Sequence, residues 1–174
     1  MNAPTPKPSP WVRRHAGLIR AGGEVLDLAC GNGRHARYLL SLDRRVTAVD
    51  LDISLITDLA DNDRVERLQA DLEHDAWPLG QRQFDGIVVV NYLHRPLFPL
   101  LLQALGNNGV LIYDTFARGN EKFGSPRNPA YLLEPGELLA EFAPQLSVVA
   151  YEFGEVSDPK RAVRQRLCAI KESR

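Results

Sequence analysis

Short apolar runs alternate with amphipathic segments along most of the chain, from residue 11 onward. Strand-like runs, short and rich in β-branched residues, are found at residues 24–29, 45–50, 65–70, 84–91 and 110–115. Between them, apolar residues recur at helical spacing, which predicts helices over residues 11–21, 33–42, 51–62 and 96–105. Two of the strands, 84–91 and 110–115, are apolar at nearly every position, which is typical of a parallel sheet covered by helices on both faces.

The C-terminal part departs from this alternation. Strand-like segments at residues 146–153 and 162–171 are joined by a connection too short for a crossover helix, so the two strands are expected to pair antiparallel. We therefore predict an α/β fold with three layers, a Rossmann-like doubly wound sheet of seven strands that is mostly parallel and ends in an antiparallel hairpin. Residues 1–10 carry four prolines and predict a disordered tail, and residues 11–174 predict a single domain.

Composition narrows the function classes. The 174 residues include 21 Lys and Arg against 22 Asp and Glu, which argues against a protein devoted to binding nucleic acid or anionic membranes. No apolar run approaches the ~18 residues of a membrane helix. The two cysteines show no C-x-x-C spacing, and we expect a reducing, cytoplasmic location. The histidines show no metal-ligand spacing, so we expect no metal site.

A glycine turn carries the clearest chemistry. Gly31, Asn32 and Gly33 follow the first strand and open a helix, and Asp50 ends the next strand 19 positions after Gly31. This spacing places a turn that a ligand can approach closely beside a carboxylate able to bind ribose hydroxyls. Several nucleoside cofactors fit the pattern, and Asp50 could alternatively be a helix cap.

Asp27, inside the strand before the turn, discriminates between those cofactors. A dinucleotide would bring its pyrophosphate close to this carboxylate and be repelled, whereas an ammonium or sulfonium group would be stabilised. Asp27 therefore indicates S-adenosylmethionine, the alternative being a structural carboxylate that caps the turn.

Five ordered motifs carry a family resemblance. The segments VLDLACGNG (25–33), VTAVDLD (46–52), QADLE (69–73) and FDGIVVVNYLH (84–94), with the terminal hairpin, resemble the class I S-adenosylmethionine-dependent methyltransferases. The GRHA helix start and the segment NPAYLLEPGELL (128–139) are similar to the small bacterial tellurite-resistance-type enzymes.

The resemblance implies roles for individual residues. Asp27 and Gly31 would surround the methionine moiety of the cofactor, and Asp50 would bind its ribose. The remaining implied cofactor contacts are Ala29, Asn32 and Gly33 in the turn, Leu51 on the adenine face, Asp71 and Leu72 at the adenine edge, and Asn91 beside the transferable methyl. Ala29 stands where many members have glycine. We expect its methyl group to be tolerated if the backbone angle there is unremarkable, and to narrow the cleft slightly. Asp71 could instead only cap the segment after the third strand.

Candidates for acid–base chemistry and for substrate contacts follow the later strands. Tyr92, His94 and Asp114 are candidate general bases, needed only if the acceptor nucleophile carries a proton at neutral pH. His94 could equally cap the next helix or lie on the surface, and Asp114 could only bond neighbouring backbone. The segment 117–135, rich in Gly, Asn and Pro, is a candidate lid. Candidate substrate contacts are Phe116, Phe123, Asn128 and Tyr131, although turn chemistry and core leucines explain most of that region.

The sequence thus predicts a methyltransferase with a small-molecule acceptor. Still open are an RNA or protein methyltransferase of the same fold, a cofactor-binding module without catalysis, and, more remotely, an NAD-dependent oxidoreductase. The motif Asn91-Tyr92-Leu93-His94 departs from the Asn-Pro-Pro-Tyr of base methyltransferases, which lowers the nucleic-acid alternative. Arg164 and Arg166 alternate along one strand and are expected on a solvated face. Arg34 could reach the cofactor carboxylate or lie solvated.

Overall fold

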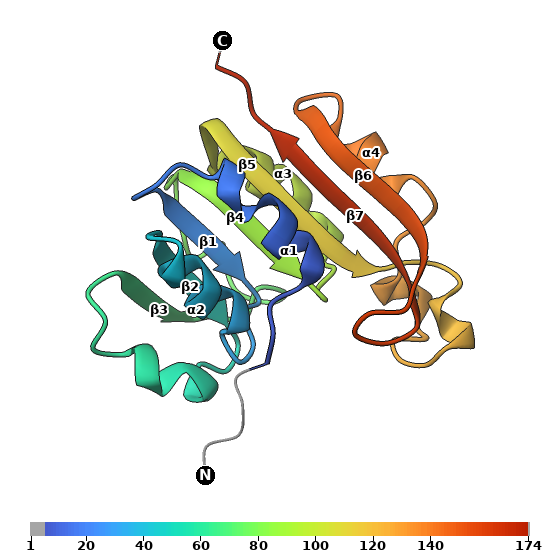
Figure 1. Cartoon of the computed structure of the whole chain (residues 1–174), viewed down its shortest axis with the longest axis horizontal. Coiled ribbons are helices and arrows are strands. Elements are labelled where there is room, and N and C mark those ends of the chain that lie inside the picture. The colour runs from blue at the N-terminus through green and yellow to red at the C-terminus, as the bar shows by residue number, and fades with distance from the viewer. Residues whose placement is uncertain (1–5, 174) are drawn as a thin grey trace.

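A computed structural model describes residues 6–173. Seven strands form one sheet in the order β3-β2-β1-β4-β5-β7-β6 (Figure 1). The strands are β1 (Glu24–Leu28), β2 (Arg45–Asp50), β3 (Val65–Gln69), β4 (Phe84–Val90), β5 (Leu105–Phe116), β6 (Ser147–Val156) and β7 (Ala162–Ile170). The first five are parallel, and β7 pairs antiparallel with both β5 and β6. The predicted mixed α/β sheet is confirmed.

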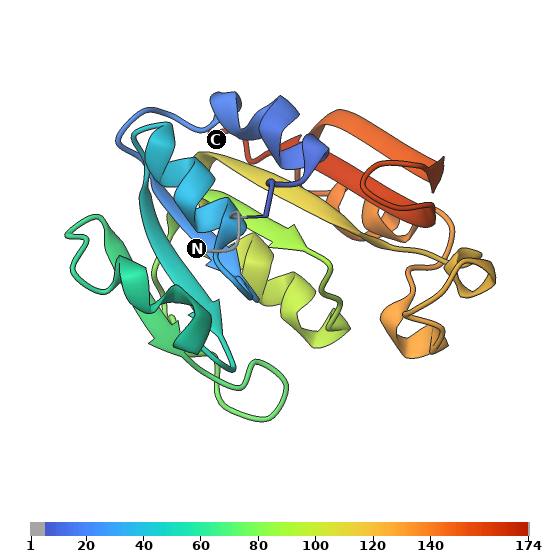
Figure 2. The same ribbon diagram turned by 60° about the horizontal axis from the view of Figure 1, so that its bottom comes forward.

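Helices cover both faces of the sheet, as Figure 2 shows. On one face, α1 (Pro10–His15) and α2 (Arg34–Ser41) pack over an apolar core that includes Trp11, Leu39 and Val88. The opposite face is covered by α3 (Phe98–Ala104) and α4 (Glu137–Phe142), over a second core that includes Phe98 and Phe142. This two-sided burial explains why β4 is apolar at nearly every position.

The helix predicted over residues 51–62 is wrong. This region contains only short 3-10 turns, η2 (Ser54–Leu59), with a non-helical backbone at Ile56. The Asp52 side chain accepts the Ser54 N–H at 2.9 Å, a local bond that competes with helix formation. Leu51 and Leu55 are each 62% exposed, so they do not form the apolar face on which the helical spacing was based. Further short 3-10 turns are η1 (Ala16–Leu18), η3 (Arg95–Leu97), η4 (Asn120–Lys122) and η5 (Pro129–Tyr131).

Residues 6–10 lie against the domain, although the sequence places them in a disordered tail. Ser9 is only 5% exposed, and its hydroxyl caps the first helix by accepting the Trp11 N–H at 3.1 Å. Residues 6–10, called the strap below, are therefore part of the folded domain. The rest of the predicted tail, residues 1–5, lies outside the described residues. Among the helices of residues 6–173, none has the length and apolar character needed to cross a membrane.

Candidate active site

A first cleft of about 270 Å³ lies where the carboxyl ends of β1, β2 and β3 meet, the edge at which ligands bind in open α/β sheets. We call it the β1–β3 cleft. Its lining brings together six residues selected from the sequence, with Ala70, Glu73 and His74 beside them: Ala29, Asp50, Leu51, Asp71, Leu72 and Tyr92.

Asp50 joins the glycine turn to the end of β2. Its Oδ2 accepts the Gly31 N–H at 2.8 Å, and its Oδ1 accepts the Asp52 N–H at 3.1 Å. Gly31 and Gly33 have φ of +54° and +72°, and a Cβ at Gly33 would overlap the Ile56 side chain, so the turn needs glycine. No helix begins directly after Asp50, so the structure does not bear out the helix-cap alternative. Each carboxylate oxygen keeps a lone pair for a ligand hydroxyl.

The backbone at Ala29 does not meet the condition on which its methyl group was expected to be tolerated. Its φ is +53°, in the left-handed region that disfavours residues with a Cβ. Chain reversal directly after β1 imposes this conformation, because Cys30 N–H must reach the Val49 carbonyl at 3.0 Å. The alanine therefore strains the turn that forms one wall of the β1–β3 cleft.

Asp27 is a buried carboxylate that is only partly satisfied. The residue is 1% exposed, and its Oδ2 has no hydrogen-bond partner among residues 6–173. Burial raises the pKa of Asp27 to about 7, while the Ala36 N–H at the start of α2 and the charge of Arg34 act in the opposite direction. A cationic ligand group beside it would satisfy the free oxygen and restore its charge.

Asp71 has the capping role that the sequence left open. Its Oδ1 accepts the N–H groups of Glu73 and His74, and its Oδ2 lies 3.0 Å from His74 Nδ1. These bonds fix the turn after β3 and lower the pKa of Asp71. The Leu72 N–H beside it has no acceptor among the described residues and is free to bind a ligand.

The three candidate bases differ in their positions and in their hydrogen bonds. Tyr92 lines the β1–β3 cleft, and its buried hydroxyl has no hydrogen-bond partner within the described part of the chain. Burial and nearby carboxylates raise the pKa of Tyr92 far above neutral. It is therefore a proton donor in the neutral range. His94 lies outside the clefts described here and makes no capping bond to the turn that follows it. Asp114 is buried, and its oxygens accept hydrogen bonds from two arginines and the Ser9 hydroxyl.

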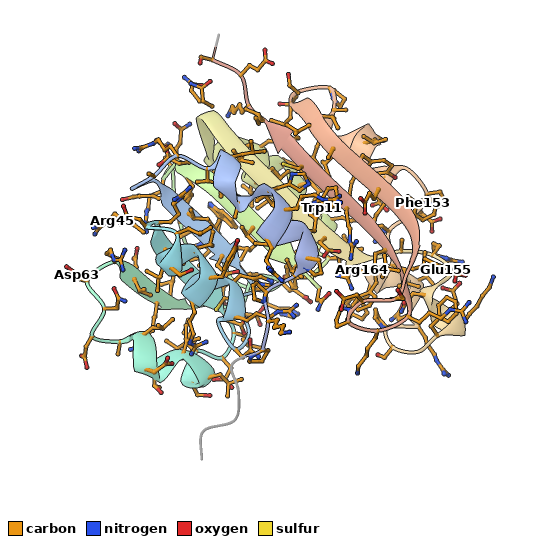
Figure 3. The ribbon with its side chains drawn as sticks, viewed as in Figure 1. Trp11, Arg45, Asp63, Phe153, Glu155 and Arg164 are labelled. Carbon is orange, nitrogen blue, oxygen red and sulfur yellow. The ribbon has the colours of Figure 1, made fainter. Side chains whose placement is uncertain are left out.

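A second cleft of about 260 Å³, called the strap cleft, lies between the strap and the ends of β4, β5 and β7. Besides the strap, it is lined by Arg13, Arg34, Val90, Asn91, Asp114, Asp158, Pro159, Arg164 and Arg166. In Figure 3, Arg164 lies at the edge of the sheet where β5 ends, far from Arg45 and Asp63 at the other side. The antiparallel course of β7 brings its first residues to the carboxyl edge of the parallel strands.

Asp114 is the centre of a buried ion-pair network. Its Oδ1 accepts Arg164 Nε at 2.6 Å and Arg166 Nε at 3.2 Å, and its Oδ2 accepts the Ser9 hydroxyl at 2.6 Å. Arg164 also donates to Asn91 Oδ1 at 2.5 Å. The expectation that Arg164 and Arg166 lie on a solvated face is wrong, since they are 8% and 9% exposed. The alternative that Asp114 bonds only neighbouring backbone is wrong too.

The strap is also bonded to α2. The Ser9 N–H donates to His35 Nε2 at 3.1 Å, which requires His35 to be neutral. Burial, helped by the charge of Arg34, lowers the pKa of His35 to about 3, so this requirement holds at neutral pH. Sequence reasoning missed the strap, because its prolines suggested disorder and the partners of Ser9 are distant in the chain.

The candidate substrate residues line neither cleft. Phe116 and Phe123 stack under arginines, with Arg164 Cζ 4.4 Å and Arg161 Cζ 4.6 Å from the respective ring centroids. Asn128 caps a 3-10 turn, and Tyr131 is 49% exposed. The turn-and-core alternative therefore explains this segment better: Leu132, Leu133 and Leu138 are buried.

Arg95 fastens the predicted lid to the domain. It donates to the carbonyls of Ala130 and Leu132, each at 3.0 Å, and pairs with Glu137 at 2.5 Å. The movement of this segment stays a prediction.

Comparison with known proteins agrees with this geometry. Residues 25–107 match the family model described as a methyltransferase domain. Comparison with curated proteins finds no match.

Solved structures extend the likeness to nearly the whole chain. A methyltransferase from Methanosarcina mazei, described as S-adenosylmethionine-dependent, is 14% identical with a TM-score of 0.72, over 97% of this chain and 100% of that one. The 1,6-didemethyltoxoflavin-N1-methyltransferase of Burkholderia thailandensis is 23% identical, with a TM-score of 0.68 over 94% and 76%. TehB from Haemophilus influenzae is 20% identical, with a TM-score of 0.70 over 92% and 61%. The chain therefore has the Rossmann-like fold of S-adenosylmethionine-dependent methyltransferases, and the resemblance seen in its sequence is confirmed.

Proposed function

We propose that this protein is an S-adenosylmethionine-dependent methyltransferase that acts on a small-molecule acceptor by in-line methyl transfer. The observation that carries the proposal is the placement of two carboxylates at one glycine turn. Asp50 accepts the Gly31 N–H and lines the β1–β3 cleft. Asp27 lies in the strand that leads into the same turn, and its buried Oδ2 has no hydrogen-bond partner among residues 6–173.

The residues present suit the cofactor. The unpaired Asp27 oxygen would bind the positive charge of the methionine moiety, and no atom lies within 4 Å of a Cβ built at Gly31, which leaves open space beside the turn. Asp50 would accept the ribose hydroxyls. The free Leu72 N–H would donate to the adenine edge, and the exposed Leu51 side chain would pack on its face.

The bound cofactor would supply a methyl group already activated by its sulfonium, so the protein contributes orientation and exclusion of water. Asn91 is well placed for this role, since it lines the strap cleft at the end of β4 with its side chain fixed by Arg164. Asp114 is saturated by ion pairs and Tyr92 is protonated, so we propose an acceptor whose nucleophile needs no protein base.

The dimensions of the strap cleft favour a small acceptor. A volume of about 260 Å³ beneath the strap suits a small molecule better than a folded nucleic acid or protein. The Burkholderia relative acts on 1,6-didemethyltoxoflavin according to its name, which agrees with an acceptor of this kind.

Calorimetric titration with S-adenosylhomocysteine and, separately, with NAD tests the proposal. We expect saturable binding of S-adenosylhomocysteine, loss of at least tenfold in affinity in Asp50→Ala, and unchanged affinity in Asp63→Ala. Asp63 precedes β3 and lies near Arg45, at the amino-terminal ends of the strands (Figure 3). Circular dichroism confirms that each variant is folded. Binding of NAD alone, or of neither compound, would overturn the proposal.

A further inference from the structure

Positive charge dominates the strap cleft. Its lining contains five cationic side chains and two carboxylates, Asp114 and Asp158. The cationic side chains are Lys7, Arg13, Arg34, Arg164 and Arg166. Asp114 is already shared at its Oδ1 by Arg164 and Arg166, and Arg166 also pairs with Glu152 at 3.4 Å. The excess positive charge of the lining therefore rests on Lys7, Arg13 and Arg34. The excess is unusual for a chain whose net charge is -1.

Several of these donors have hydrogen-bonding capacity to spare. Arg34 is partly buried, and within residues 6–173 its side chain donates only to the Lys7 carbonyl, at 3.2 Å. Burial and the charge of Arg164 lower the pKa of Arg34, as expected where cations crowd without enough counter-charge. Arg13 is exposed and lines the same cleft, and its side chain makes no hydrogen bond to residues 6–173. A guanidinium group binds planar carboxylates and other oxyanions through paired N–H donors.

We propose that the strap cleft binds an anionic group of the methyl acceptor, a carboxylate or another oxyanion, through Arg34 and Arg13. Arg166 lines the same cleft and adds to its positive charge. This inference rests on the proposed function and specifies its substrate class. Asn91 lines the same cleft at the end of β4, so an acceptor held by its anionic group would lie beside the residue expected next to the transferable methyl. Asp114 acts as a positioning residue that orients Arg164 and Arg166.

The cofactor offers a second source of the same chemistry, because its methionine moiety carries a carboxylate. The two sources are separated by saturating the protein with S-adenosylhomocysteine before the anion is added. An acceptor site stays open under those conditions, whereas a cofactor-carboxylate site is already filled.

The experiment titrates sulfate and benzoate into the protein by calorimetry at constant ionic strength, with and without saturating S-adenosylhomocysteine. Benzamide, the neutral isostere of benzoate, is the matched control ligand. The test variant is Arg13→Met with Arg34→Met, and the matched control is Arg20→Met, which removes an exposed arginine that pairs with Asp85 outside the cleft.

We expect saturable one-site binding of sulfate or benzoate to the S-adenosylhomocysteine complex, no binding of benzamide, and at least tenfold weaker anion binding in the double variant alone. Lack of anion binding, or equal weakening by Arg20→Met, would overturn the proposal. Anion binding abolished by S-adenosylhomocysteine would assign the cleft to the cofactor carboxylate and also overturn it. Failure of S-adenosylhomocysteine to bind would count against the proposed function. The titration of the anion without S-adenosylhomocysteine would still show whether the strap cleft binds an anion, so the two failures are distinguishable.

Discussion

The Ser9 hydroxyl donates a 2.6 Å hydrogen bond to Asp114 Oδ2, across 105 positions of the chain. The backbone N–H of Ser9 donates to His35 Nε2 at 3.1 Å, so this one residue of the strap is bonded to both β5 and α2. Because Asp114 also orients Arg164, the position of the strap and the arrangement of charge in the strap cleft are linked.

Removing the Ser9 hydroxyl should destabilise the domain. In Ser9→Ala, Asp114 Oδ2 loses its donor in a buried site, which costs about 1–3 kcal/mol. Chemical denaturation measures the free energy of unfolding. Ser147→Ala, which removes an exposed 2.6 Å bond to Glu172, is the control and should change stability by less than about 0.5 kcal/mol. Equal effects of the two substitutions on the free energy of unfolding would show that the buried bond from Ser9 to Asp114 stabilises the protein no more than the exposed one.

Stability should fall as the pH falls below 6.5, through His35. The unfolded chain protonates this histidine near its ordinary pKa of 6.5, whereas burial lowers the pKa in the folded protein to about 3. The unfolded state therefore binds more protons between these values, and the contribution is lost progressively as the pH drops. The slope reaches at most about 1.4 kcal/mol per pH unit. Urea denaturation of wild type and His35→Gln from pH 7 to 4 tests this, and identical slopes would contradict it.

The sheet was predictable because buried parallel strands have long apolar runs. The observed β2 has the bounds expected from its sequence, and β4 differs from its prediction by one residue. The helix predicted over residues 51–62 was wrong because helical spacing alone does not show whether the leucines of this segment are buried. No helix was predicted over α4, whose N-terminus follows Pro135 and Gly136, residues that indicate a turn.

Ala29→Gly should stabilise the protein. Ala29 has a φ of +53°, where a Cβ is unfavourable, so glycine should raise the free energy of unfolding by about 1 kcal/mol. The control Ala48→Gly, at a fully buried position of β2, should lower it by about 1 kcal/mol or more. Thermal or urea unfolding measures both, and destabilisation by Ala29→Gly would show that the alanine methyl makes contacts that outweigh its strain.

Affinity for S-adenosylhomocysteine should rise with pH through Asp27. Burial raises the pKa of this carboxyl to about 7, so its charged form, which would bind the ligand ammonium, increases between pH 6 and pH 8. If only that form binds well, affinity rises by about tenfold over this interval. Asp27→Asn should bind more weakly and without this pH dependence. A wild-type affinity that is constant from pH 6 to 8 would contradict the role of Asp27.

The glycine turn and the β1–β3 cleft were foreseeable because their residues follow consecutive strands at fixed spacing. The strap cleft was not, because Ser9, Asp114 and Arg164 are separated by long stretches of sequence and meet only through the antiparallel β7. Arginines in the run AVRQRLCAI indicate a buried pair only once β7 is known to lie between β5 and β6. The strap cleft therefore forms through contacts between distant segments, which no local sequence pattern predicts.

A crystal structure of the protein with S-adenosylhomocysteine tests the central claim most directly. The account predicts adenosine in the β1–β3 cleft, with its ribose hydroxyls on Asp50 and its adenine edge at the Leu72 N–H, and the amino group of the ligand beside Asp27. The strap cleft should stay open next to the sulfur. Adenosine bound elsewhere on the protein, or a ligand whose amino acid portion fills the strap cleft, would contradict it.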